Sequence, residues 1–291
     1  MLPAAIALTG PNGMTGRHIR SLIERKGVRC IAVDRAAWDL REWREMEALD
    51  RLFGGAQAVV HAGATVPPPG EPAPARDLFD ANVRACLCLG EWASARNVPV
   101  VYMSGAIAYG DAARAGIIES DQITIRTHGG FYGASKVLGE MVLDRMRGEG
   151  LRLCVLRPSS IYGFGMHPAK MVAAFLERAS RGETITLAQP VDDRINLVHA
   201  ADVAAAAVGA LEHESWDTFN VAGATTVSML EIAETCVAVA GAGKVEIEAQ
   251  AASREPAVRF DLNCNKAAAT IGYRPRVTLR DGLSRMLAGA T

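Results

Sequence analysis

The stretch that decides the fold of this chain is Thr9-Gly10-Pro11-Asn12-Gly13-Met14-Thr15-Gly16. It follows a short apolar run and leads into a helical pattern with Ile19, Leu22 and Ile23 on one face. In the spacing G-x-x-G-x-x-G, the first glycine permits a tight turn and the second lets the backbone approach a pyrophosphate. The third lets the helix pack against the strand. The sequence therefore predicts a strand, turn and helix whose N-terminal N–H groups hold the phosphates of a dinucleotide.

A second apolar run ends at Asp34 and Arg35, where the adenosine of such a dinucleotide would lie. Asp34 comes 18 positions after Gly16, where a carboxylate can accept hydrogen bonds from both ribose hydroxyls, which favours NAD. Arg35 could instead pair with a 2′-phosphate, so NADP stays open. The alternative without a ligand is a glycine-rich turn in which Asp34 caps the backbone and Arg35 is solvated.

The first half of the chain alternates apolar runs with helical patterns. Runs that are apolar throughout are typical of a parallel sheet covered on both faces, and right-handed crossovers make such a sheet doubly wound. We expect an α/β fold with a Rossmann-type dinucleotide-binding domain over residues 1–162. Residues 163–291 should form mainly a smaller C-terminal α/β substrate-binding lobe, with segments near 194–222 returning to the sheet. The predicted strands are Ala4 to Leu8, Val28 to Val33, Gln57 to His61, Val98 to Met103 and Leu151 to Leu156.

Composition excludes several classes of protein. The chain has 291 residues, of which 49% are apolar, and 31 Lys and Arg against 32 Asp and Glu leave a net charge of −1. No global field would draw it to nucleic acid or to an anionic membrane. The longest apolar stretch, near Val203 to Leu211, is too short to span a bilayer. Six cysteines without C-x-x-C spacing predict a cytoplasmic protein with no disulfide and no metal.

A second motif, Tyr132-Gly133-Ala134-Ser135-Lys136, begins the helical pattern before the fifth strand. Spacing i,i+4 puts the phenol and the ammonium on one helical face. A free tyrosine has a pKa of about 10 and is a poor base at neutral pH, but a nearby cation favours the phenolate. Tyr132 is therefore the candidate acid/base while hydride passes between a substrate carbon and a nicotinamide. The alternative is an aromatic residue and a snorkelling lysine on a surface helix.

The order of these motifs resembles the extended short-chain dehydrogenase/reductase family, also called the NAD-dependent epimerase/dehydratase family, nearly from end to end. Asp39-Leu40 resembles its adenine-contacting pair, Ala62-Gly63-Ala64 its stretch under the cofactor, and Asn82 its helix asparagine. Leu156-Arg157-Pro158 resembles the segment where nicotinamide and substrate meet. The cofactor-binding residues implied by the motifs and the resemblance are Gly10, Asn12, Gly13, Met14, Thr15, Gly16, Asp34, Arg35, Asp39, Leu40, Ala62, Gly63, Ala64, Asn82, Tyr132, Lys136 and Pro158.

The chain departs from the family at the residue that donates a hydrogen bond to the reacting oxygen. The family carries Ser or Thr four positions before the tyrosine of its "VYG" turn, and here that position is Gly105. Ser104 is adjacent, and it serves only if the strand end bends, with Thr65 or Tyr109 as stand-ins. The alternative for Ser104 is a hydroxyl satisfied at a strand terminus. No carboxylate lies in Met103 to Gly105, which disfavours the chemistry of sugar dehydratases.

The substrate that the resemblance implies is a nucleotide sugar. Ser160 takes the position of an asparagine that contacts the diphosphate, while Arg194 and Arg254 match its two arginines; Arg194 could equally form an internal salt bridge. The substrate-binding candidates are Thr65, Gly105, Ser160, Arg194 and Arg254. The helical patterns Leu78 to Ala95 and Tyr132 to Met146 resemble those that pair across a homodimer in this family.

We therefore expect an enzyme that binds NAD, with NADP possible, and transfers hydride at a secondary alcohol or ketone. Its catalytic residues are Tyr132 as acid/base, Lys136, which lowers the pKa of Tyr132 and holds the ribose, and Ser104 or a substitute. Redox epimerisation of a nucleotide sugar is the favoured reaction. A dehydrogenase or reductase that releases its nicotinamide product is the first alternative. A non-catalytic dinucleotide sensor, suggested by Gly105, is the second.

Overall fold

The computed structural model describes residues 1–110, 114–127, 129–249 and 254–291. Its centre is a six-stranded sheet in the order β2-β1-β3-β4-β5-β9, in which every neighbouring pair is parallel. Five of these strands overlap the five predicted runs, and the predicted doubly wound α/β class is confirmed. The strands are β1 (Ala5–Thr9), β2 (Arg29–Val33), β3 (Ala58–His61), β4 (Val100–Met103), β5 (Leu153–Pro158) and β9 (Thr218–Val221).

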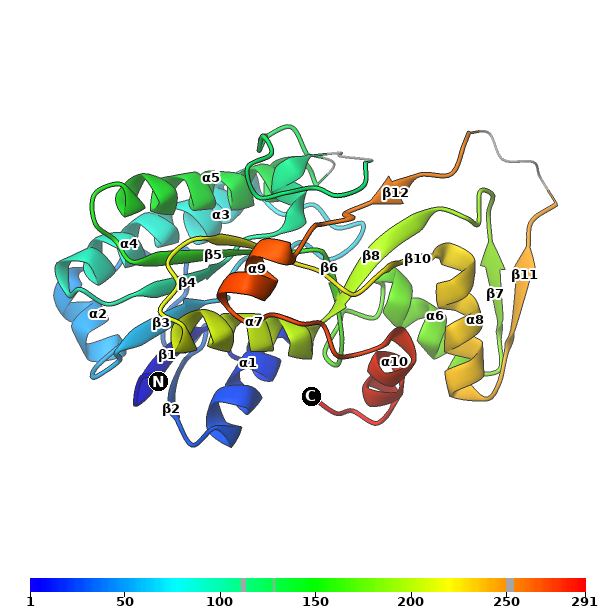
Figure 1. The fold of residues 1–291 in the computed structure, drawn as a ribbon, viewed down its shortest axis with the longest axis horizontal. Coiled ribbons are helices and arrows are strands. Elements are labelled where there is room, and N and C mark those ends of the chain that lie inside the picture. The colour runs from blue at the N-terminus through cyan, green and yellow to red at the C-terminus, as the bar shows by residue number, and fades with distance from the viewer. Residues whose placement is uncertain (111–113, 128, 250–253) are drawn as a thin grey trace.

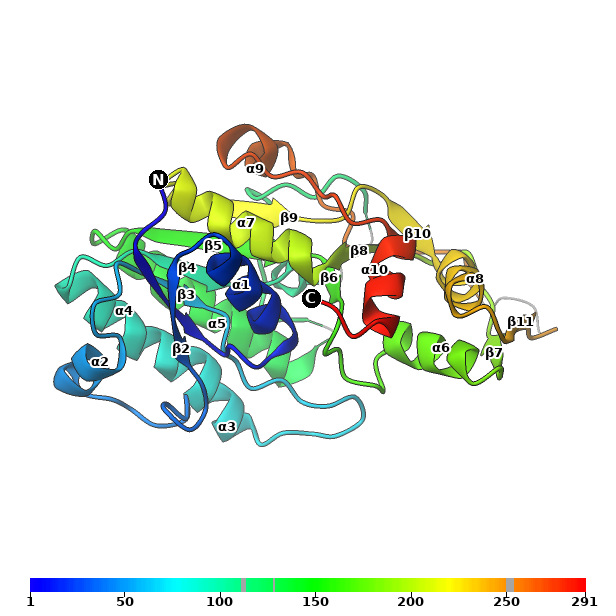
Figure 2. The same cartoon turned by 90° about the horizontal axis from the view of Figure 1, so that it is seen from below.

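Helices cover both faces of the sheet (Figures 1 and 2). Alternate strand residues enter the two resulting cores. Ile6 and Leu8 of β1 pack with α1 (Met14–Arg25) and α7 (Ala200–Glu212) on one face. Ala7, between them, points to the other face, which is covered by α2 (Met46–Leu52), α4 (Ala85–Ala95) and α5 (Gly130–Arg147). This burial on both sides is the reason that the inner strands are mostly apolar, whereas the edge strand β2 begins with the exposed Arg29.

The helical segment ahead of β4 changes its winding midway. It runs through α3 (Ala75–Phe79), a π-helical turn over Asp80–Arg84, and α4 without a break. The predicted helix Leu78 to Ala95 covers most of it. π-Helical turns inside α-helices occur frequently at functional sites. The π-helical turn contains Asn82, whose side chain is buried at the edge of the candidate site.

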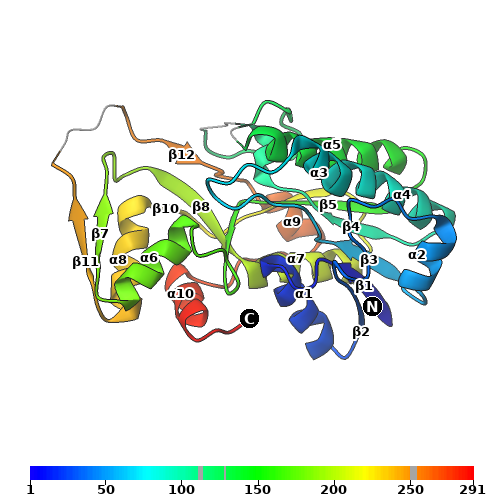
Figure 3. The same cartoon turned by 180° about the vertical axis from the view of Figure 1, so that it is seen from behind.

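The second half of the chain builds a smaller lobe beyond one end of the sheet (Figures 1 and 3). Its central strand is β8 (Arg194–His199), which pairs with β6 (Ser160–Tyr162), antiparallel with β10 (Thr226–Ser228), and with β12 (Val258–Arg259). A separate pair joins β7 (Thr184–Leu187) to β11 (Lys244–Ile247). The helices of the lobe are α6 (Met171–Ser180), α8 (Met229–Ala240) and α10 (Leu279–Leu287).

The second half also returns to the first. α7 packs along α1, β9 adds the sixth strand beside β5, and the short α9 (Asn265–Thr270) contacts β9. The lobe therefore stays next to the carboxyl edge of the sheet, where ligands of open α/β sheets bind. All six cysteines are free thiols. Among the described residues, no helix is long and apolar enough to cross a bilayer.

Candidate active site

The glycine loop between β1 and α1 forms a cradle that side chains would fill. Gly10 has φ +67°, and a Cβ built on it would lie 2.7 Å from the Cα of Gly63. A Cβ on Gly16 would lie 1.9 Å from the carbonyl oxygen of Gly10. The first and third glycines are therefore required by the turn and by close packing of helix on strand, as their spacing predicts.

The middle glycine plays a different part. A Cβ on Gly13 would meet only the Gly10 oxygen, at 3.4 Å, so packing does not demand a glycine here. Gly13 is the N-cap of α1 and provides no side-chain cap for the N–H groups of the first turn. Asn12 is exposed beside it, while Met14 and Thr15 begin the helix half-buried. The N–H donors of this turn have no side-chain cap, so they are available to the pyrophosphate of a dinucleotide.

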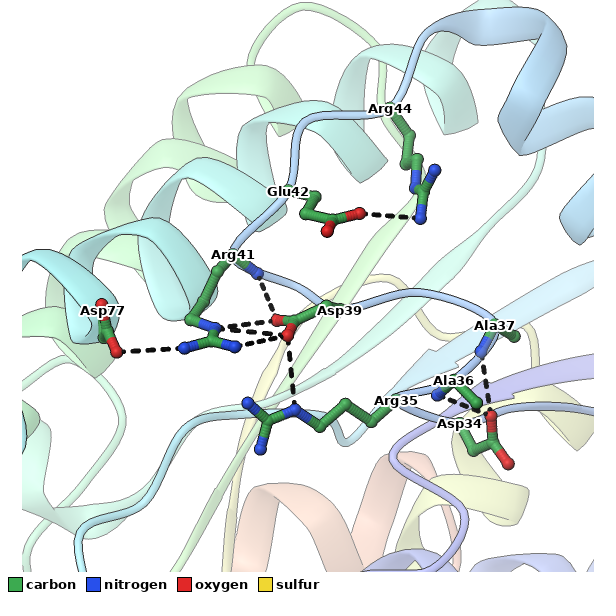
Figure 4. Close-up of polar contacts among 9 residues, drawn as sticks. All are labelled: Asp34, Arg35, Ala36, Ala37, Asp39, Arg41, Glu42, Arg44 and Asp77. Atoms are coloured by element: carbon green, nitrogen blue, oxygen red, sulfur yellow. Dashed lines mark hydrogen bonds and ion pairs between the residues drawn. The ribbon is translucent and has the colours of Figure 1, made fainter.

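Asp34 and Arg35 lie at the carboxyl end of β2 (Figure 4). Asp34 Oδ1 accepts the backbone N–H groups of Ala36 and Ala37, each at 3.0 Å, so the residue does cap a turn. Because Oδ1 already accepts these two hydrogen bonds, Oδ2 is the stronger candidate to accept a hydrogen bond from the ribose. Arg35 Nε donates to Asp39 Oδ2 at 3.3 Å. Arg35 is therefore in an ion pair, although its side chain is 76% exposed.

Asp39 and Leu40 occupy the next part of the loop. Asp39 pairs with Arg41 through both carboxylate oxygens, and the side-chain hydrogen bonds from Arg41 hold the pKa of Asp39 well below its usual range. The Leu40 side chain lies close to Gly63, since a Cβ on Gly63 would lie 2.9 Å from Leu40 Cδ1. Leu40 thus borders the stretch after β3, whereas the carboxylate of Asp39 is occupied by arginine.

The stretch after β3 is tied to β1 by a buried hydroxyl. Thr9 Oγ1 accepts the N–H of Gly63 at 3.1 Å and shares a hydrogen bond of 2.7 Å with Nδ1 of His61. Burial, helped by the charge of Lys136, lowers the pKa of His61 to about 3, so this imidazole is neutral. Gly63 is buried between the half-buried Ala62 and Ala64. These bonds hold the backbone of this stretch against the glycine cradle.

Asn82 braces this loop against α5. Its Oδ1 accepts the N–H of Thr65 at 2.8 Å, and its Nδ2 donates to the Thr65 carbonyl at 3.0 Å and to Ser135 Oγ at 2.9 Å. Ser135 Oγ in turn donates to the carbonyl of Tyr132 at 2.8 Å. The amide of Asn82 is thus fully used inside the protein. It fixes the position of Thr65 relative to Tyr132.

The hydroxyl of Thr65 itself is available. Thr65 is half-buried, and among the described residues nothing forms a hydrogen bond with its Oγ1. Its backbone is clamped on both sides by Asn82, so the side chain has a fixed base. A positioned hydroxyl of this kind can donate to an oxygen of a bound molecule.

Tyr132, Lys136 and Glu140 follow one another at i,i+4 spacing on a single face of α5. Lys136 is buried, and its Nζ lies 4.4 Å from the centre of the Tyr102 ring. Burial lowers the pKa of Lys136 to about 8, partly offset by Cys86 and Glu140. Burial raises the pKa of Tyr132 above its ordinary value. The lowering of the Tyr132 pKa that was expected from Lys136 is therefore not seen.

Ser104 faces α5 by ordinary strand alternation. Like Tyr102, which donates to the carbonyl of Lys136, Ser104 points to the α5 side of β4, so no bend of the strand is needed. Gly105 after it is extended. The Ser104 hydroxyl, however, donates to the carboxylate of Glu140. This is the arrangement expected for a hydroxyl satisfied within the protein.

Glu140 is the centre of a buried network that the sequence motifs did not reveal. Arg157 donates to it through Nε and Nη2, and the side chains of this ion pair are 7% and 4% exposed. Arg157 Nη1 also donates to the Tyr109 hydroxyl at 2.9 Å, which donates to Asn220 Oδ1 at 2.7 Å. Tyr109 is therefore also committed to internal partners. The one sequence signal for Glu140 was its place four residues after Lys136.

The remaining candidates lie where β5 leads into the lobe. Pro158 is buried at the end of β5, and Ser160 is half-buried at the start of β6. Between them, Ser159 donates to Asn196 Oδ1 at 2.9 Å, a contact of β8 that the motifs did not single out. Asn196 also bonds Gly223 in both directions, which joins β8 to the segment after β9.

Arg194 and Arg254 are close in the lobe, but both form internal ion pairs. Arg194 pairs with Glu231 at 3.2 Å and donates to Thr226, and Arg254 pairs with Asp193, the neighbour of Arg194. The N–H of Arg194 bonds the carbonyl of residue 257, so the two segments run side by side. The internal salt bridge foreseen as the alternative for Arg194 is present.

Comparison with known proteins identifies the family. Residues 6–222 match the NAD dependent epimerase/dehydratase family. The chain is 31% identical over 150 residues to dTDP-4-dehydro-6-deoxy-D-allose reductase from a Streptomyces species, a match that covers 49% of this chain and 46% of the reductase. It is 24% identical over 255 residues to dTDP-glucose 4,6-dehydratase from Streptomyces niveus, covering 84% and 75% of the two chains.

The chain is also similar in structure to solved proteins. The crystal structure of UDP-N-acetylglucosamine 4-epimerase from Bacillus cereus matches with a TM-score of 0.82 at 23% identity, over 98% of this chain and 95% of that chain. At this identity the likeness is one of fold. The family match covers most of the chain, and the glycine cradle fits a dinucleotide, so the resemblance drawn from the sequence is confirmed. The chain belongs to the NAD-dependent epimerase/dehydratase family of enzymes, the extended short-chain dehydrogenases/reductases.

Proposed function

We propose that this chain catalyses the redox epimerisation of a nucleotide-linked sugar with a retained NAD. The observation that carries the proposal is the face of α5, where Tyr132 and Lys136 lie one turn apart, next to a loop held by Asn82. α5 follows β4 and begins at the carboxyl edge of the parallel sheet, at which the glycine cradle also opens. A proton-transferring side chain therefore lies near the place where a nicotinamide would be held.

Tyr132 is the proposed acid/base. Bound NAD supplies the hydride acceptor and, when oxidised, a positive charge beside the phenol. Because burial alone raises the pKa of Tyr132, the phenol needs such cations before it can take a hydroxyl proton at neutral pH. Lys136, whose pKa of about 8 keeps it mostly charged at pH 7, is the resident cation of the pair. Its proposed second task is to hold the nicotinamide ribose.

Thr65 is the proposed donor to the substrate oxygen. Of the three hydroxyls considered for this task, that of Ser104 donates to Glu140 and that of Tyr109 donates to Asn220. The Thr65 hydroxyl has no such partner in the described part of the chain, and Asn82 holds its backbone. Ser104 then has a structural role, because its hydroxyl bonds Glu140 of α5, which pairs with Arg157. Glu140, the carboxylate that the Ser104 hydroxyl contacts, is paired with Arg157, which argues against dehydratase chemistry.

Substrate selection is assigned to the lobe. Arg194 and Arg254, on adjacent segments, are the proposed contacts of a diphosphate, with Ser160 beside the reacting sugar. Each arginine has an internal carboxylate partner, so a diphosphate would have to share or replace Glu231 and Asp193. An exposed ion pair is weak enough to permit such an exchange.

A dehydrogenase or reductase is the second candidate, favoured by the 31% identity to a nucleotide-sugar reductase over half of the chain. Incubation with UDP-glucose and dTDP-glucose separates the two, with NMR of the sugar and absorbance of the nicotinamide as readouts. Isomerised sugar without net NADH formation supports the epimerase, whereas net change of the nicotinamide supports the rival. Native mass spectrometry of the purified protein should find retained NAD.

The decisive variant is Tyr132→Phe. It should abolish turnover while NADH affinity, measured by fluorescence titration, stays within about threefold, because the phenol oxygen serves proton transfer. Unchanged turnover would remove Tyr132 from the mechanism. A wild-type chain that binds NADH yet turns over none of the sugars tested, and shows no exchange of label with them, would favour a dinucleotide sensor instead.

Assembly and location complete the proposal. Phe79, Leu87 and Met141, on α3, α4 and α5, are apolar side chains with 43%, 37% and 51% exposure, which supports a homodimer through these helices. Sedimentation of the wild type and of Leu87→Glu tests this, with a monomeric variant expected. A cytoplasmic location is proposed because all six cysteines are free thiols, as in reducing compartments.

A further inference from the structure

The ammonium of Lys136 lies against the ring of Tyr102, on β4. Its Nζ is 4.4 Å from the centre of that ring, and the two residues are 5% and 0% exposed. Within the part of the chain that the structure describes, no carboxylate, hydroxyl or carbonyl forms a hydrogen bond or ion pair with Nζ. The face of an aromatic ring attracts a cation, and does so more strongly where water is excluded. The ring of Tyr102 is therefore the group that stabilises this buried charge.

Tyr102 contacts the same lysine a second time. Its hydroxyl donates to the backbone carbonyl of Lys136 at 3.3 Å. Gly139, three residues further along α5, permits this approach, because a Cβ built on it would lie 2.9 Å from Tyr102 Oη. The ring and the hydroxyl of Tyr102 thus fix both the side chain and the backbone of Lys136 relative to the sheet.

The ring of Tyr102 is itself held by a residue of β3. His61 stacks with it, with ring centres 5.9 Å apart and planes inclined by 20°, and Thr9 fixes this imidazole through the hydrogen bond to Nδ1. Burial and the charge of Lys136 lower the pKa of His61 to about 3, so the imidazole adds no second positive charge. Lys136, Tyr102 and His61 therefore form one buried layer that runs from α5 across β4 to β3.

The other titratable groups that face Lys136 leave its charge uncancelled. Glu140 follows one turn later on α5, and its carboxylate is paired with Arg157. Burial raises the pKa of the Cys86 thiol, on α4, to about 11, so this thiol is uncharged at neutral pH. Tyr132 is one turn before Lys136, and burial raises its pKa as well. An aromatic ring stabilises the ammonium without cancelling its positive charge, as a carboxylate would.

We propose that Tyr102 is a positioning residue that holds the charged form of Lys136 toward the nicotinamide ribose. The inference rests on the proposed function, in which Lys136 binds that ribose and supports Tyr132. Because the ring contacts one side of the ammonium, N–H donors remain for the ribose hydroxyls. Without the ring, the buried ammonium would lose its proton more easily. Tyr102 thus acts through Lys136 rather than on the substrate.

The pH dependence of NADH affinity tests this inference without a sugar, by fluorescence titration of the full chain between pH 6.5 and 9. The midpoint, at which NADH affinity is half its value at pH 6.5, should lie near pH 8 for the wild type, because the pKa of Lys136 is about 8. Lys136→Met should abolish this fall in affinity. Tyr102→Leu should lower the midpoint by about one pH unit. Its NADH affinity should then be within about twofold of the wild type at pH 6.5 and about fivefold weaker at pH 8.

Substitutions that keep a ring separate its electrostatic effect from its packing. Tyr102→Phe loses only the hydroxyl and should keep the wild-type midpoint. In place of Tyr102, 3,4,5-trifluorophenylalanine keeps the ring but withdraws electron density from its face. It should lower the midpoint, and it tests the inference even where Tyr102→Leu fails to fold.

Phe219→Leu is the matched control. Phe219 is also buried, and the Nζ of Lys266 lies 5.4 Å from the centre of its ring on β9, away from α5. The substitution removes a buried ring and its contact with a lysine, as Tyr102→Leu does, but at a different place. It should leave the midpoint of NADH binding unchanged.

Three results would overturn the inference. Equal weakening of NADH binding by Tyr102→Leu at pH 6.5 and pH 8 would show that the ring has only a structural role. An unchanged midpoint with the trifluorinated ring would show that the ring face does not stabilise the ammonium. NADH affinity of the wild type that does not change across pH 8 would show that the charge of Lys136 does not serve the ribose.

Failure of the proposed reaction gives a different pattern. A wild type that binds NADH with the expected midpoint yet isomerises no sugar would overturn the proposed epimerisation and support this inference. A wild type that does not bind NADH would overturn both.

Discussion

The hydroxyl of Ser104 donates to the carboxylate of Glu140, eight positions along α5 from Tyr132. Because Arg157 occupies the same carboxylate, this hydroxyl is held in a buried ion-pair network. The residue closest in sequence to the usual donor position is therefore oriented toward the protein interior. We therefore propose that the contact to a substrate oxygen is made by Thr65, whose hydroxyl has no hydrogen-bond partner in the described part of the chain.

Thr65→Val and Ser104→Ala should separate these two roles. Loss of the Thr65 hydroxyl is expected to lower kcat about a hundredfold, as for one donor to a developing oxyanion. Ser104→Ala should lower turnover less than about threefold and cost about 1–2 kcal/mol of stability, since it removes one bond to a charged group. Steady-state kinetics and urea unfolding of both variants provide the measurement. A larger kinetic effect for Ser104→Ala would return the donor role to Ser104.

Glu140→Gln should be strongly destabilising. The variant leaves Arg157 buried without its counter-charge, which typically costs about 3–5 kcal/mol of the free energy of unfolding. Glu149→Gln is the matched control, because its pair with Arg145 is exposed and should change stability by less than about 1 kcal/mol. Urea unfolding compares the two. Similar small effects would mean that the buried network contributes little.

Lys136 gives the stability of the cofactor-free chain a pH dependence. Its pKa is about 8 when folded against 10.5 as an ordinary lysine, so the unfolded chain binds more protons between these values and stability rises with pH there. Lys136→Met should therefore stabilise the chain by about 3 kcal/mol at pH 7. This gain should decline as pH rises from 8 to 10.5. Urea unfolding across this range measures it, and a gain independent of pH would contradict the assignment.

The glycine cradle predicts opposite behaviour for two similar variants. Gly16→Ala forces a Cβ to within 1.9 Å of a backbone oxygen, so it should cost about 1–3 kcal/mol of stability and weaken NADH binding. Gly13→Ala meets only a 3.4 Å contact and should fold normally, yet bind NADH more weakly because its methyl group would face the phosphates at the proposed cofactor site. Unfolding and titration distinguish the two. Normal NADH affinity in Gly13→Ala would remove Gly13 from the cofactor site.

The fold was predictable because its signals are local. A strand buried on both faces is mostly apolar rather than alternating, and the runs near β1, β3, β4 and β5 show this without knowledge of their neighbours. Gly10 and Gly16 belong to one turn. Their spacing in the sequence predicts the close backbone approach between them that the structure shows. β9 (Thr218–Val221) was not among the five predicted strands, although segments near 194–222 were expected to return to the sheet. Its four residues include Asn220 and gain their place by pairing with β5.

The sequence by itself determined the sheet, the glycine cradle and the spacing of Tyr132 and Lys136, since each depends on residues within one or two turns of the chain. Only the tertiary structure decided which polar groups are free. Ser104 meets Glu140, Arg35 meets Asp39 and Thr65 meets Asn82, and hydrogen-bond partners of that kind are chosen by distance in space rather than along the chain. A buried polar group takes whichever partner packing brings to it.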